Sequence, residues 1–447
     1  MAGAAGLDEA RELIERHGIH TIECAFPDVW GTPRGKRIPA SHFLRSAGKG
    51  FAIANVCHVW DLHCDIFDTP FCAFDSGWPD MAVVPDLGTL RLATWREGTA
   101  LCLCDTVDER THEPIAVDSR QILRRAVERV RAQGYEPLMA SEIEFHLCTP
   151  DWEPLYGGVH CYSITKGAEV EPIVGDIRRK LAGFGIEVEA CNVEYGPAQV
   201  EVNLHYGPAL EVADNTLIFK YVVKEIARQH GVRATFMAKP FAKEAGNGLH
   251  VHQSLRSLES GQNAFAAEDF HGEGPIRSRV MRRWLTGLLE HQVELTAVNC
   301  PTINSYKRVE DYSFAPTCVT WGGDNRTVAV RSVSGLGAAN RLEARGAAAD
   351  ANPYLVLTGQ LHAGLDGIDR NLPLPDFTPG DAYVDTSSPR LPTNLADALD
   401  AFEGSSFYRE AWGDLFVDTF VAMGRHEVDL FQRQVTDWER TRYMEIV

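Results

Sequence analysis

The sequence predicts an α+β protein with two domains, a small one over residues 1–108 and a larger one over residues 109–447. Two observations lead to this prediction. Up to about residue 108 the chain consists of short strand-like runs separated by turn residues, whereas the remainder alternates long helical patterns with short strands. Because this alternation is not a regular βαβ repeat, it favours the α+β class. A chain of 447 residues with 45% hydrophobic content can bury a large core.

The N-terminal domain is expected to contain a β-hairpin over residues 21–40, TIECAFPDVWGTPRGKRIPA. Its turn is expected to hold Gly31, Pro33 and Gly35. The larger domain then begins with a helix. Asp118 and Ser119 provide its N-terminal cap, apolar residues follow at helical spacing, and Gly134 ends it.

Longer helical patterns follow this first helix. They cover residues 172–184, 214–230, 277–297 and 353–365, with two or three more helices after residue 394. The Pro-rich stretch 371–383, NLPLPDFTPGDAY, is predicted to be a surface excursion. No internal repeat interrupts the pattern, so a repeat architecture is not expected.

Composition and charge exclude several classes of function. The formal net charge is -19 and basic residues form no cluster, so neither nucleic acid nor an anionic membrane is an expected partner. The first residues carry acids where a signal peptide is basic, and no apolar run reaches the roughly 18 residues of a membrane span, so we expect a cytoplasmic protein. Eleven cysteines without a CxxC pair are expected to be reduced core residues rather than a disulfide framework or a zinc knuckle.

Charged side chains recur on one face of four predicted strands, because alternate residues of a strand point the same way. The four sets are Glu142, Glu144 and His146; Glu201, Asn203 and His205; His250, His252 and Ser254; and Arg341, Glu343 and Arg345. Any one of these strands alone is typical of the solvated face of an antiparallel sheet. Four of them together indicate a functional face.

Carboxylates gathered on such a face repel one another unless cations bind between them. The face would collect Glu142, Glu144, Glu194, Glu201 and Glu343 with one imidazole. Hard oxygen donors with a single His select Mg²⁺ or Mn²⁺ rather than zinc. Arginines that suit phosphate and carboxylate oxygens lie nearby in the sequence, at Arg326, Arg331, Arg341 and Arg345. This combination predicts phosphoryl transfer with two or three metal ions, although the chain contains no P-loop motif.

The sequence resembles the glutamine synthetase family, type I, over nearly its whole length. The matching motifs include SEIEF, VEYGPAQVE, KPF followed by GNGLHVHQSL, NSYKR, NRTVAVR, RLEAR and ANPYLVLTGQLHAGLDGI. The resemblance implies a small N-terminal β-grasp domain and a catalytic domain with a curved antiparallel sheet flanked by helices. It also implies a homo-oligomeric ring, commonly a dodecamer, with active sites shared between adjacent subunits.

The resemblance assigns a role to each candidate position. It implies a first metal site at Glu144, Glu194 and Glu201 and a second at Glu142, His250 and Glu343. It implies ATP contacts at Tyr206, His252, Ser254, Arg331 and Arg341. The glutamate carboxylates would meet Arg308, Arg345 and the backbone of Gly246, and Arg326 would face the transferring phosphoryl group. The implied reaction phosphorylates the γ-carboxylate of glutamate with ATP, after which an amine displaces phosphate.

Three positions depart from the ammonia-using members of the family. Phe314 occupies the place of the lid glutamate that helps to deprotonate ammonium, and Ala52 and Asn55 stand where an ammonium-binding Asp and a Ser are expected. Ammonium needs nearby carboxylates to bind and to lose its proton, whereas an apolar residue suits an organic amine. Candidates to receive the amine head group are Glu310, Asp311, His58, Trp60 and Asp61. Each of these is more often only a surface or core residue.

The sequence therefore predicts a ligase that joins glutamate to an organic amine such as a polyamine or ethanolamine, with Arg308, Arg326 and Phe314 as the residues that decide its chemistry. Ammonia-dependent glutamine synthesis and a non-catalytic role in assembly remain the alternatives. Ala245 stands where the resemblance places an Asn of the glutamate loop, which is a further departure from the family pattern. Pro373 stands at the position of the adenylylated Tyr, so that mode of regulation is not expected.

Overall fold

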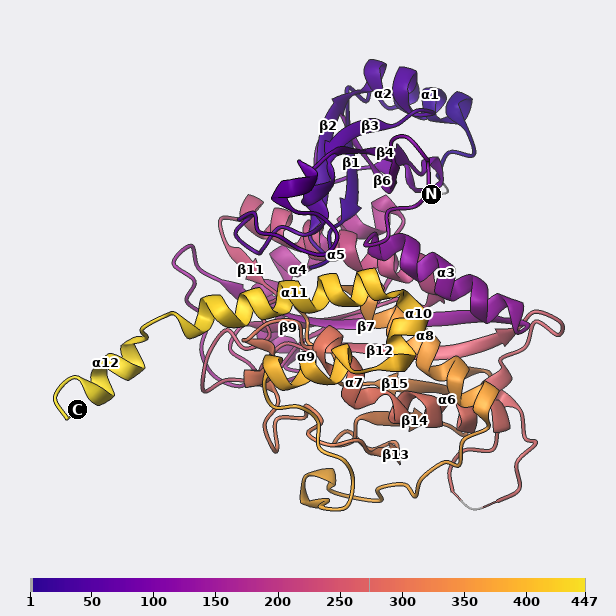
Figure 1. Ribbon diagram of the computed structural model, residues 1–447, viewed down its shortest axis with the longest axis vertical. Coiled ribbons are helices and arrows are strands. Elements are labelled where there is room, and N and C mark those ends of the chain that lie inside the picture. The colour runs from indigo at the N-terminus through magenta and orange to yellow at the C-terminus, as the bar shows by residue number, and fades with distance from the viewer. Residues whose placement is uncertain (1–2, 273, 447) are drawn as a thin grey trace.

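The computed structural model describes residues 3–272 and 274–446, and it confirms the α+β class. The N-terminal part forms a six-stranded sheet with the order β2-β1-β6-β4-β3, and β5 pairs with β6. The strands are β1 (Thr21–Pro27), β2 (Pro33–Pro39), β3 (Phe51–Ala54), β4 (Asp80–Pro85), β5 (Arg91–Leu92) and β6 (Thr99–Asp108). Helices α1 (Leu7–Arg16) and α2 (Ala40–Ser46) lie at the end of this sheet that is farthest from the rest of the chain, at the top of Figure 1.

The predicted hairpin forms, but its turn is shorter than expected. Strands β1 and β2 pair from Thr21 opposite Pro39 to Pro27 opposite Pro33, so Pro33 and Gly35 belong to β2 and not to the turn. The Asp28 carboxylate closes the turn by accepting a hydrogen bond from the Thr32 amide at 2.7 Å. Pro33 is tolerated because β2 is an edge strand, and a Cβ at Gly35 would lie 1.8 Å from the carbonyl oxygen of Cys24.

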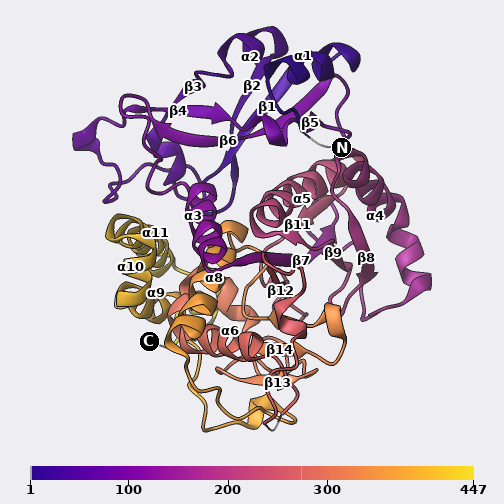
Figure 2. The same cartoon turned by 90° about the vertical axis from the view of Figure 1, so that its right-hand side faces the viewer.

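The larger sheet has nine strands in the order β13-β14-β15-β12-β7-β9-β8, with β10 and β11 also pairing with β7. Its pairs are antiparallel except for β13 and β14, and Figure 2 shows how the sheet curves around its central strands. The strands are β7 (Tyr135–Cys148), β8 (Val188–Val193), β9 (Gln199–Leu204), β10 (Gly207–Pro208), β11 (Arg233–Thr235), β12 (Leu249–Ser257), β13 (Trp321–Gly323), β14 (Val330–Val333) and β15 (Arg341–Ala344).

The helices of this part are α3 (Ser119–Ala132), α4 (Ile164–Phe184), α5 (Ala209–Gln229), α6 (Arg279–Glu290), α7 (Gln292–Asn299), α8 (Pro353–Arg370), α9 (Leu395–Glu403), α10 (Ser406–Trp412), α11 (Asp414–Gln432) and α12 (Asp437–Tyr443). Helices α3 to α6 contact the sheet itself, α7 to α11 pack on other helices, and α12 stands away from the body (Figure 1). The expected cap of α3 is confirmed, because the Asp118 carboxylate accepts hydrogen bonds from the amides of Arg120 and Gln121. None of the described helices has the length and hydropathy needed to cross a membrane.

Four helix predictions were wrong in their boundaries, one of them because α8, expected to end at residue 365, continues to Arg370. After residue 394 the described residues form four helices instead of the two or three expected. Helix α4 begins at Ile164 because the Ser163 hydroxyl caps it, and Pro172, the expected start, lies inside the helix. Helix α5 begins at Ala209, five residues before the predicted position 214. The single helix expected over 277–297 is divided at His291, whose ring nitrogens contact the carboxylates of Glu294 and Asp366.

The apolar core is continuous from the N-terminal sheet to the helices of the larger sheet. No strand pairing joins the two sheets in the described ranges, but this core crosses between them, so the boundary at residue 108 stays a prediction. Along β7, Ile143, Phe145 and Leu147 are fully buried and Glu142 and Glu144 are half-buried, as the alternation predicts. The other face of the sheet is therefore free to carry polar chemistry.

The cysteine prediction was correct for most positions. All eleven cysteines are free, and most are buried. Cys64 is exposed, and Cys161 and Cys191 are half-buried, so these three are not core residues.

Candidate active site

The strand register brings the predicted charged residues together on the inner face of the larger sheet. Central strand β7 places Glu144 opposite Glu201 of β9 and Glu142 opposite His250 of β12. Strand β15 then places Glu343 opposite His252. Residues from four stretches of sequence thus share one surface because their strands are neighbours.

A tight group of potential metal ligands forms where β7, β12 and β15 meet. Glu142, His250 and Glu343 each offer one potential ligand atom, and these three atoms lie within 4.8 Å of one another. The His250 Nδ1 atom is 2.7 Å from Glu142 Oε1 and 3.8 Å from Glu343 Oε1. Burial acts to raise the pKa of Glu343, but the Arg345 guanidinium and the rings of His250 and His252 lower it to about 2. The group can therefore offer ionised carboxylates and one imidazole to a divalent cation.

A second group of carboxylates, Glu144, Glu194 and Glu201, lies next to the first. The Glu144 carboxylate accepts a hydrogen bond from the Gly248 amide at 2.5 Å, and Asn192 Nδ2 donates to Glu194 Oε1 at 2.7 Å. Burial, together with the charges of Glu142, Glu144 and Glu194, raises the pKa of Glu201 to about 9. Like charges gathered in a buried place are relieved by a bound cation.

We expect the protein without divalent cations to lose stability as the pH rises from about 5 to about 9. Folded Glu201 keeps a proton that the unfolded chain has already released, because its pKa is about 9 instead of 4.5. The free energy of unfolding therefore falls with pH between these values. A divalent cation replaces that proton, so Mg²⁺ should raise the melting temperature more at pH 9 than at pH 6. Thermal unfolding in chelator and in Mg²⁺ measures both effects.

The control for this pH dependence is Glu201→Gln, which removes the titrating group and keeps its shape. Its melting temperature in chelator should depend less on pH than that of the unchanged protein. An exposed carboxylate distant from the site, Glu259, provides a second comparison in the variant Glu259→Gln, which should behave like the unchanged protein. An identical pH dependence in Glu201→Gln would contradict the prediction.

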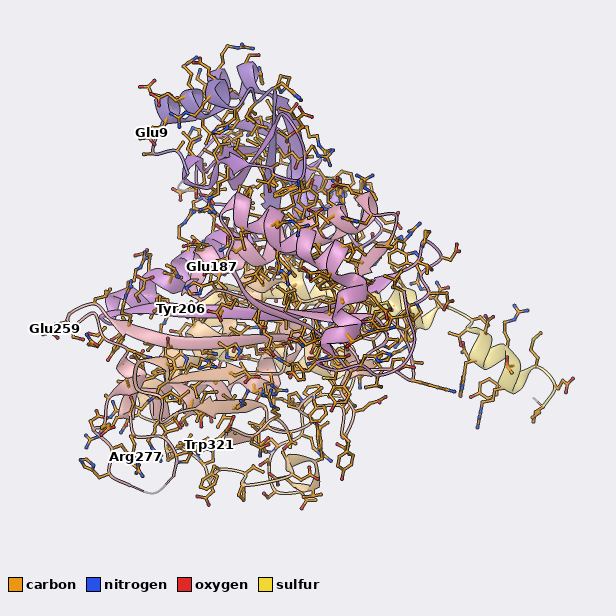
Figure 3. The ribbon with its side chains drawn as sticks, turned by 180° about the vertical axis from the view of Figure 1, so that it is seen from behind. Glu9, Glu187, Tyr206, Glu259, Arg277 and Trp321 are labelled. Atoms are coloured by element: carbon orange, nitrogen blue, oxygen red, sulfur yellow. The ribbon has the colours of Figure 1, made fainter. Side chains whose placement is uncertain are left out.

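A cavity of about 760 Å³ opens along the two groups. The predicted residues that line it are Glu142, Glu201, Asn203, Tyr206, His252, Ser254, Arg326, Arg331 and Arg341. Tyr206 is exposed at the rim (Figure 3), where a ring can stack on a planar base. Arg331 Nη1 lies 2.8 Å from Glu343 Oε2, which ties the cavity to the tight group. Sequence reasoning missed Tyr162 and Asn192, which also line it and lie in a loop and on β8, outside the motifs.

Two buried arginines lie at the end of the site near Glu144. Arg308 lies against Gly246 and Gly248, where an added Cβ would come within 2.9 Å and 2.7 Å of its side chain. Arg308 Nη1 and Arg345 Nε are buried and have no hydrogen-bond partner in the described structure. Unsatisfied donors on buried cations are costly unless a ligand accepts from them. These residues therefore fit an anionic substrate such as a carboxylate.

Phe314 lies on the loop that follows Arg308, with its side chain 44% exposed. Its ring centroid is 5.8 Å from that of Tyr195, and its carbonyl oxygen accepts a hydrogen bond from Arg345 Nη2 at 3.4 Å. Both Phe314 and Tyr312 have positive φ angles, 61° and 64°. Left-handed backbone in bulky residues is unfavourable and is typical of functional loops.

Several predicted residues do not reach this site in the same chain. Ala52 lies on β3 of the N-terminal sheet, Asn55 follows it, and neither lines the cavity. His58 is fully buried, and burial lowers its pKa to about 3, so it carries no charge for an amine. His146, expected beside Glu144, is instead covered by the loop before β12 and contacts Asn247 Oδ1 at 2.9 Å.

Three further candidate residues do not line the cavity. His205 lies just past the end of β9 and contacts the carboxylate of Glu189 at 2.8 Å. Glu310 is exposed, and its carboxylate is 3.9 Å from Lys239 Nζ. Asp61 is buried and accepts hydrogen bonds from backbone amides of its own loop.

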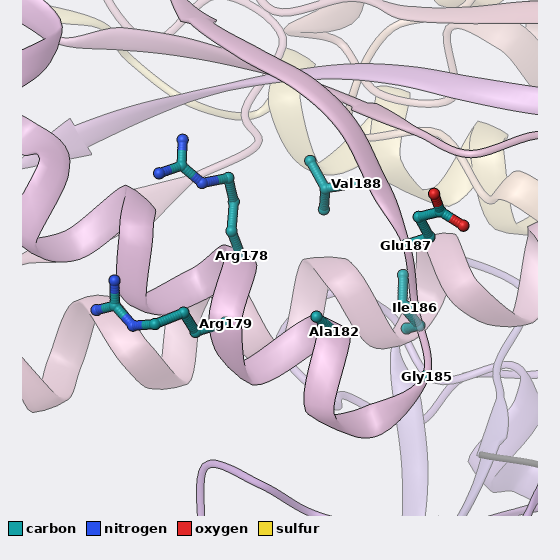
Figure 4. A pocket seen from close by; sticks show the side chains of 7 residues that line it. All are labelled: Arg178, Arg179, Ala182, Gly185, Ile186, Glu187 and Val188. Atoms are coloured by element: carbon teal, nitrogen blue, oxygen red, sulfur yellow. The ribbon is translucent and has the colours of Figure 1, made fainter.

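A separate open hollow of about 570 Å³ lies between α4 and β8 (Figure 4). It is lined by Arg178, Arg179 and Glu187 with small and apolar neighbours, and none of the predicted site residues reaches it. Arg178 already contacts Glu171 and Cys191, and Arg179 contacts Asp176. Both guanidinium groups therefore already lie beside a carboxylate of α4, and the sheet face is the better candidate site.

Comparison with known proteins identifies the family. A model of "Glutamine synthetase, catalytic domain" matches residues 116–443. The chain belongs to the glutamine synthetase family. The predicted resemblance, and with it an ATP-dependent ligase of this family, is confirmed.

Several members of the glutamine synthetase family, named for different reactions, are similar to the chain. The glutamate–isopropylamine ligase of a Pseudomonas species is 38% identical, over 98% of this chain and 98% of its own length. Gamma-glutamylethanolamide synthetase GlnA4 of Streptomyces coelicolor is 38% identical, over 98% and 96%. Type-1 glutamine synthetase 2 of Dictyostelium discoideum is 33% identical, over 95% and 84%. A solved GmaS/ADP complex has a TM-score of 0.86 and 29% identity, covering 98% of this chain and 99% of that one.

Proposed function

We propose that this protein is an ATP-dependent ligase that joins the γ-carboxylate of glutamate to an organic amine through γ-glutamyl phosphate. The single observation that carries the proposal is Phe314 on the loop after Arg308, where its carbonyl oxygen accepts a hydrogen bond from Arg345 and its ring lies near Tyr195. The similar proteins named for isopropylamine and ethanolamine support an organic amine as the nucleophile.

The residues divide between two substrates. Arg308 and Arg345, with the backbone of Gly246, would hold the carboxylates of glutamate, because their unsatisfied donors lie at that end of the site. The nucleotide would lie in the 760 Å³ cavity against Tyr206, His252, Ser254, Arg331 and Arg341. A similar structure that contains ADP supports a nucleotide in this fold.

Two to three Mg²⁺ or Mn²⁺ ions would occupy the carboxylate groups. Glu142, His250 and Glu343 on the nucleotide side have one potential ligand atom each within 4.8 Å of one another, and Glu144, Glu194 and Glu201 on the acid side offer hard oxygen donors. When bound, these cations neutralise the phosphoryl oxygens during transfer. Arg326 lines the same cavity and would face the transferring group, while the loop carrying Phe314 would exclude water from the acyl phosphate.

Phosphate release from ATP tests this function with glutamate and a panel of amines. The panel contains ammonium, methylamine, isopropylamine, ethanolamine, putrescine, spermidine and aniline. We expect release to be fastest with one of the organic amines. Fastest turnover with ammonium at low concentration would instead identify a glutamine synthetase. A folded protein that releases no phosphate with any amine would indicate a non-catalytic homologue.

The protein is also proposed to form a homo-oligomer, a dodecamer with active sites between subunits. Ala52 and Asn55, which the family resemblance assigns to the nucleophile pocket, lie away from the cavity of their own chain. A neighbouring subunit would have to supply them. Figure 1 shows α12 standing away from the body, and its apolar side chains are exposed. Such an unpartnered helix suits binding to a second copy of the chain.

We expect Trp438→Glu to reduce the size of the oligomer, because Trp438 is 61% exposed on α12. A charge there opposes burial against another subunit. Light scattering after size-exclusion chromatography measures the mass. The matched control is Trp152→Glu, since Trp152 is similarly exposed, at 49%, in the loop after β7. Equal masses for both variants and the unchanged protein would refute a role for α12 in assembly.

A further inference from the structure

Two aromatic rings meet on the acid side of the site. Tyr195 directly follows Glu194, and its amide donates a hydrogen bond to the Glu194 carboxylate at 3.2 Å. Phe314 comes from the loop after Arg308, and its carbonyl oxygen accepts a hydrogen bond from Arg345 Nη2 at 3.4 Å. The ring centroids of Tyr195 and Phe314 are 5.8 Å apart, with 37° between the ring planes. This ring pair therefore connects the carboxylates of the site to its arginines.

Both rings of the pair keep much of their surface open. Tyr195 is 49% exposed and Phe314 is 44% exposed. The loop holds Phe314 in a left-handed backbone conformation, which is unfavourable for a bulky residue and typical of functional positions. The pair thus presents apolar surface directly beside a metal-binding group of carboxylates.

An alkylammonium ion has the two parts that this surface complements. Its carbon chain gains by covering aromatic surface that otherwise faces water. Its cationic head is attracted to the acid side, because the three carboxylates of Glu144, Glu194 and Glu201 exceed the charge of one divalent cation. Glutamate and ATP are anionic and do not match an apolar wall beside carboxylates. The ring pair is therefore better suited to the amine than to either of the other two substrates.

The acidic residues on the loop of Phe314 already have partners. The Glu310 carboxylate lies 3.9 Å from Lys239 Nζ, and Asp311 Oδ1 accepts a hydrogen bond from the Thr317 hydroxyl at 3.2 Å. A diamine with one ammonium group on the acid side would carry its second one to the rings, which offer it no carboxylate. A charged or hydroxylated end there loses water without gaining an equal partner, which is costly. A plain alkyl chain does not incur this cost.

We propose that Tyr195 is a specificity-determining residue that, with Phe314, receives the carbon chain of the nucleophile, and that this nucleophile is a primary alkyl monoamine rather than a diamine or an amino alcohol. The inference rests on the proposed function, because that function makes an amine the second substrate. Tyr195 contributes the surface of its ring, and its hydroxyl is not required. Each methylene group that the rings cover should raise kcat/KM about fourfold.

Matched pairs of amines test the substrate class with the unchanged full-length protein, glutamate, ATP and Mg²⁺. We expect kcat/KM to rise about fourfold per carbon from methylamine through ethylamine to propylamine. Ethanolamine should be at least about tenfold poorer than propylamine, which has a methyl group in place of the hydroxyl. Putrescine should be at least about tenfold poorer than pentylamine, in which a methyl group replaces the second ammonium. Ethanolamine or putrescine that equals its partner would overturn the proposed substrate class.

Substitutions of Tyr195 test the residue itself. Tyr195→Ala should raise KM for propylamine about tenfold with a smaller change in kcat, and should remove the dependence on chain length. Tyr195→Phe should retain that dependence, because it keeps the ring. Trp152→Ala is the matched control, since Trp152 is also 49% exposed but lies in the loop after β7, and it should retain the dependence as well. A Tyr195→Ala protein with unchanged chain-length dependence would overturn the role of Tyr195.

Hydroxylamine separates this inference from the proposed function. It is a small nucleophile, uncharged at neutral pH and without a carbon chain for the rings, so γ-glutamyl hydroxamate reports formation of the acyl phosphate alone. The unchanged protein and Tyr195→Ala should form hydroxamate at similar rates. Hydroxamate formation without any dependence on the chain length of alkylamines would refute the role of the ring pair and keep the ligase. Absence of hydroxamate, together with no phosphate release with any amine, would refute the proposed function and this inference with it.

Discussion

Glu343→Ala should lower the rate of phosphate release by about a thousandfold or more. The carboxylate of Glu343 is buried between the guanidinium groups of Arg331 and Arg345 and lies 3.8 Å from His250. Its removal deletes one ligand of the proposed nucleotide-side cation and leaves two arginines without their common partner. Loss of several kcal/mol of charge stabilisation in the transition state corresponds to this factor, since about 1.4 kcal/mol changes a rate tenfold.

The same substitution should also destabilise the fold, because breaking a buried ion pair costs roughly 3–5 kcal/mol. Activity must therefore be measured below the unfolding transition of the variant. Glu343→Gln keeps the volume and removes the charge, so it should lose activity nearly as completely with a smaller change in stability. Glu259→Ala, in an exposed loop beyond β12, is the control and should remain active. Unchanged phosphate release by a folded Glu343→Ala protein would show that the metal assignment is wrong.

The face of the larger sheet could be predicted because strand geometry is local. A period of two puts Glu142 and Glu144 on one face whatever the partner strands are, and the apolar residues between them are buried as expected. His146 follows the same alternation but is buried, since Phe241 and Asn247 of a distant loop fold over it. Local pattern cannot show which part of a strand a loop will cover.

Contacts between distant segments also explain the other differences. Tyr162 reaches the cavity only because its loop is hydrogen-bonded to the end of β8, and no spacing in the sequence signals this. The division of the helix at His291 depends on Asp366 of α8, which lies far along the chain. Ala52 and Asn55 show what family resemblance leaves open. It assigns both residues to the nucleophile pocket, yet neither lines the cavity of its own chain.

Phe314→Glu should shift the preference of the enzyme from organic amines toward ammonium. The Phe314 ring lies against Tyr195 next to Glu194, so it offers apolar contact close to the proposed acid-side cation site. A carboxylate at this position removes that contact and provides a group that can bind ammonium and accept its proton. We expect kcat/KM for the best organic amine to fall about tenfold and that for ammonium to rise by a similar factor, because a change of one apolar contact in a pocket has this size.

The comparison of three variants separates the role of the Phe314 side chain from a general effect on the loop. Phe314→Leu keeps an apolar residue in the same strained backbone, at φ 61°, and should keep the preference for organic amines. Tyr312→Glu adds a carboxylate two residues earlier, at a side chain that is 70% exposed and packs near Tyr383, and should also leave the preference unchanged. A folded and active Phe314→Glu variant with an unaltered ratio of kcat/KM values for the two nucleophiles would show that residue 314 does not select the amine. The selectivity would then have to come from residues supplied by a neighbouring subunit.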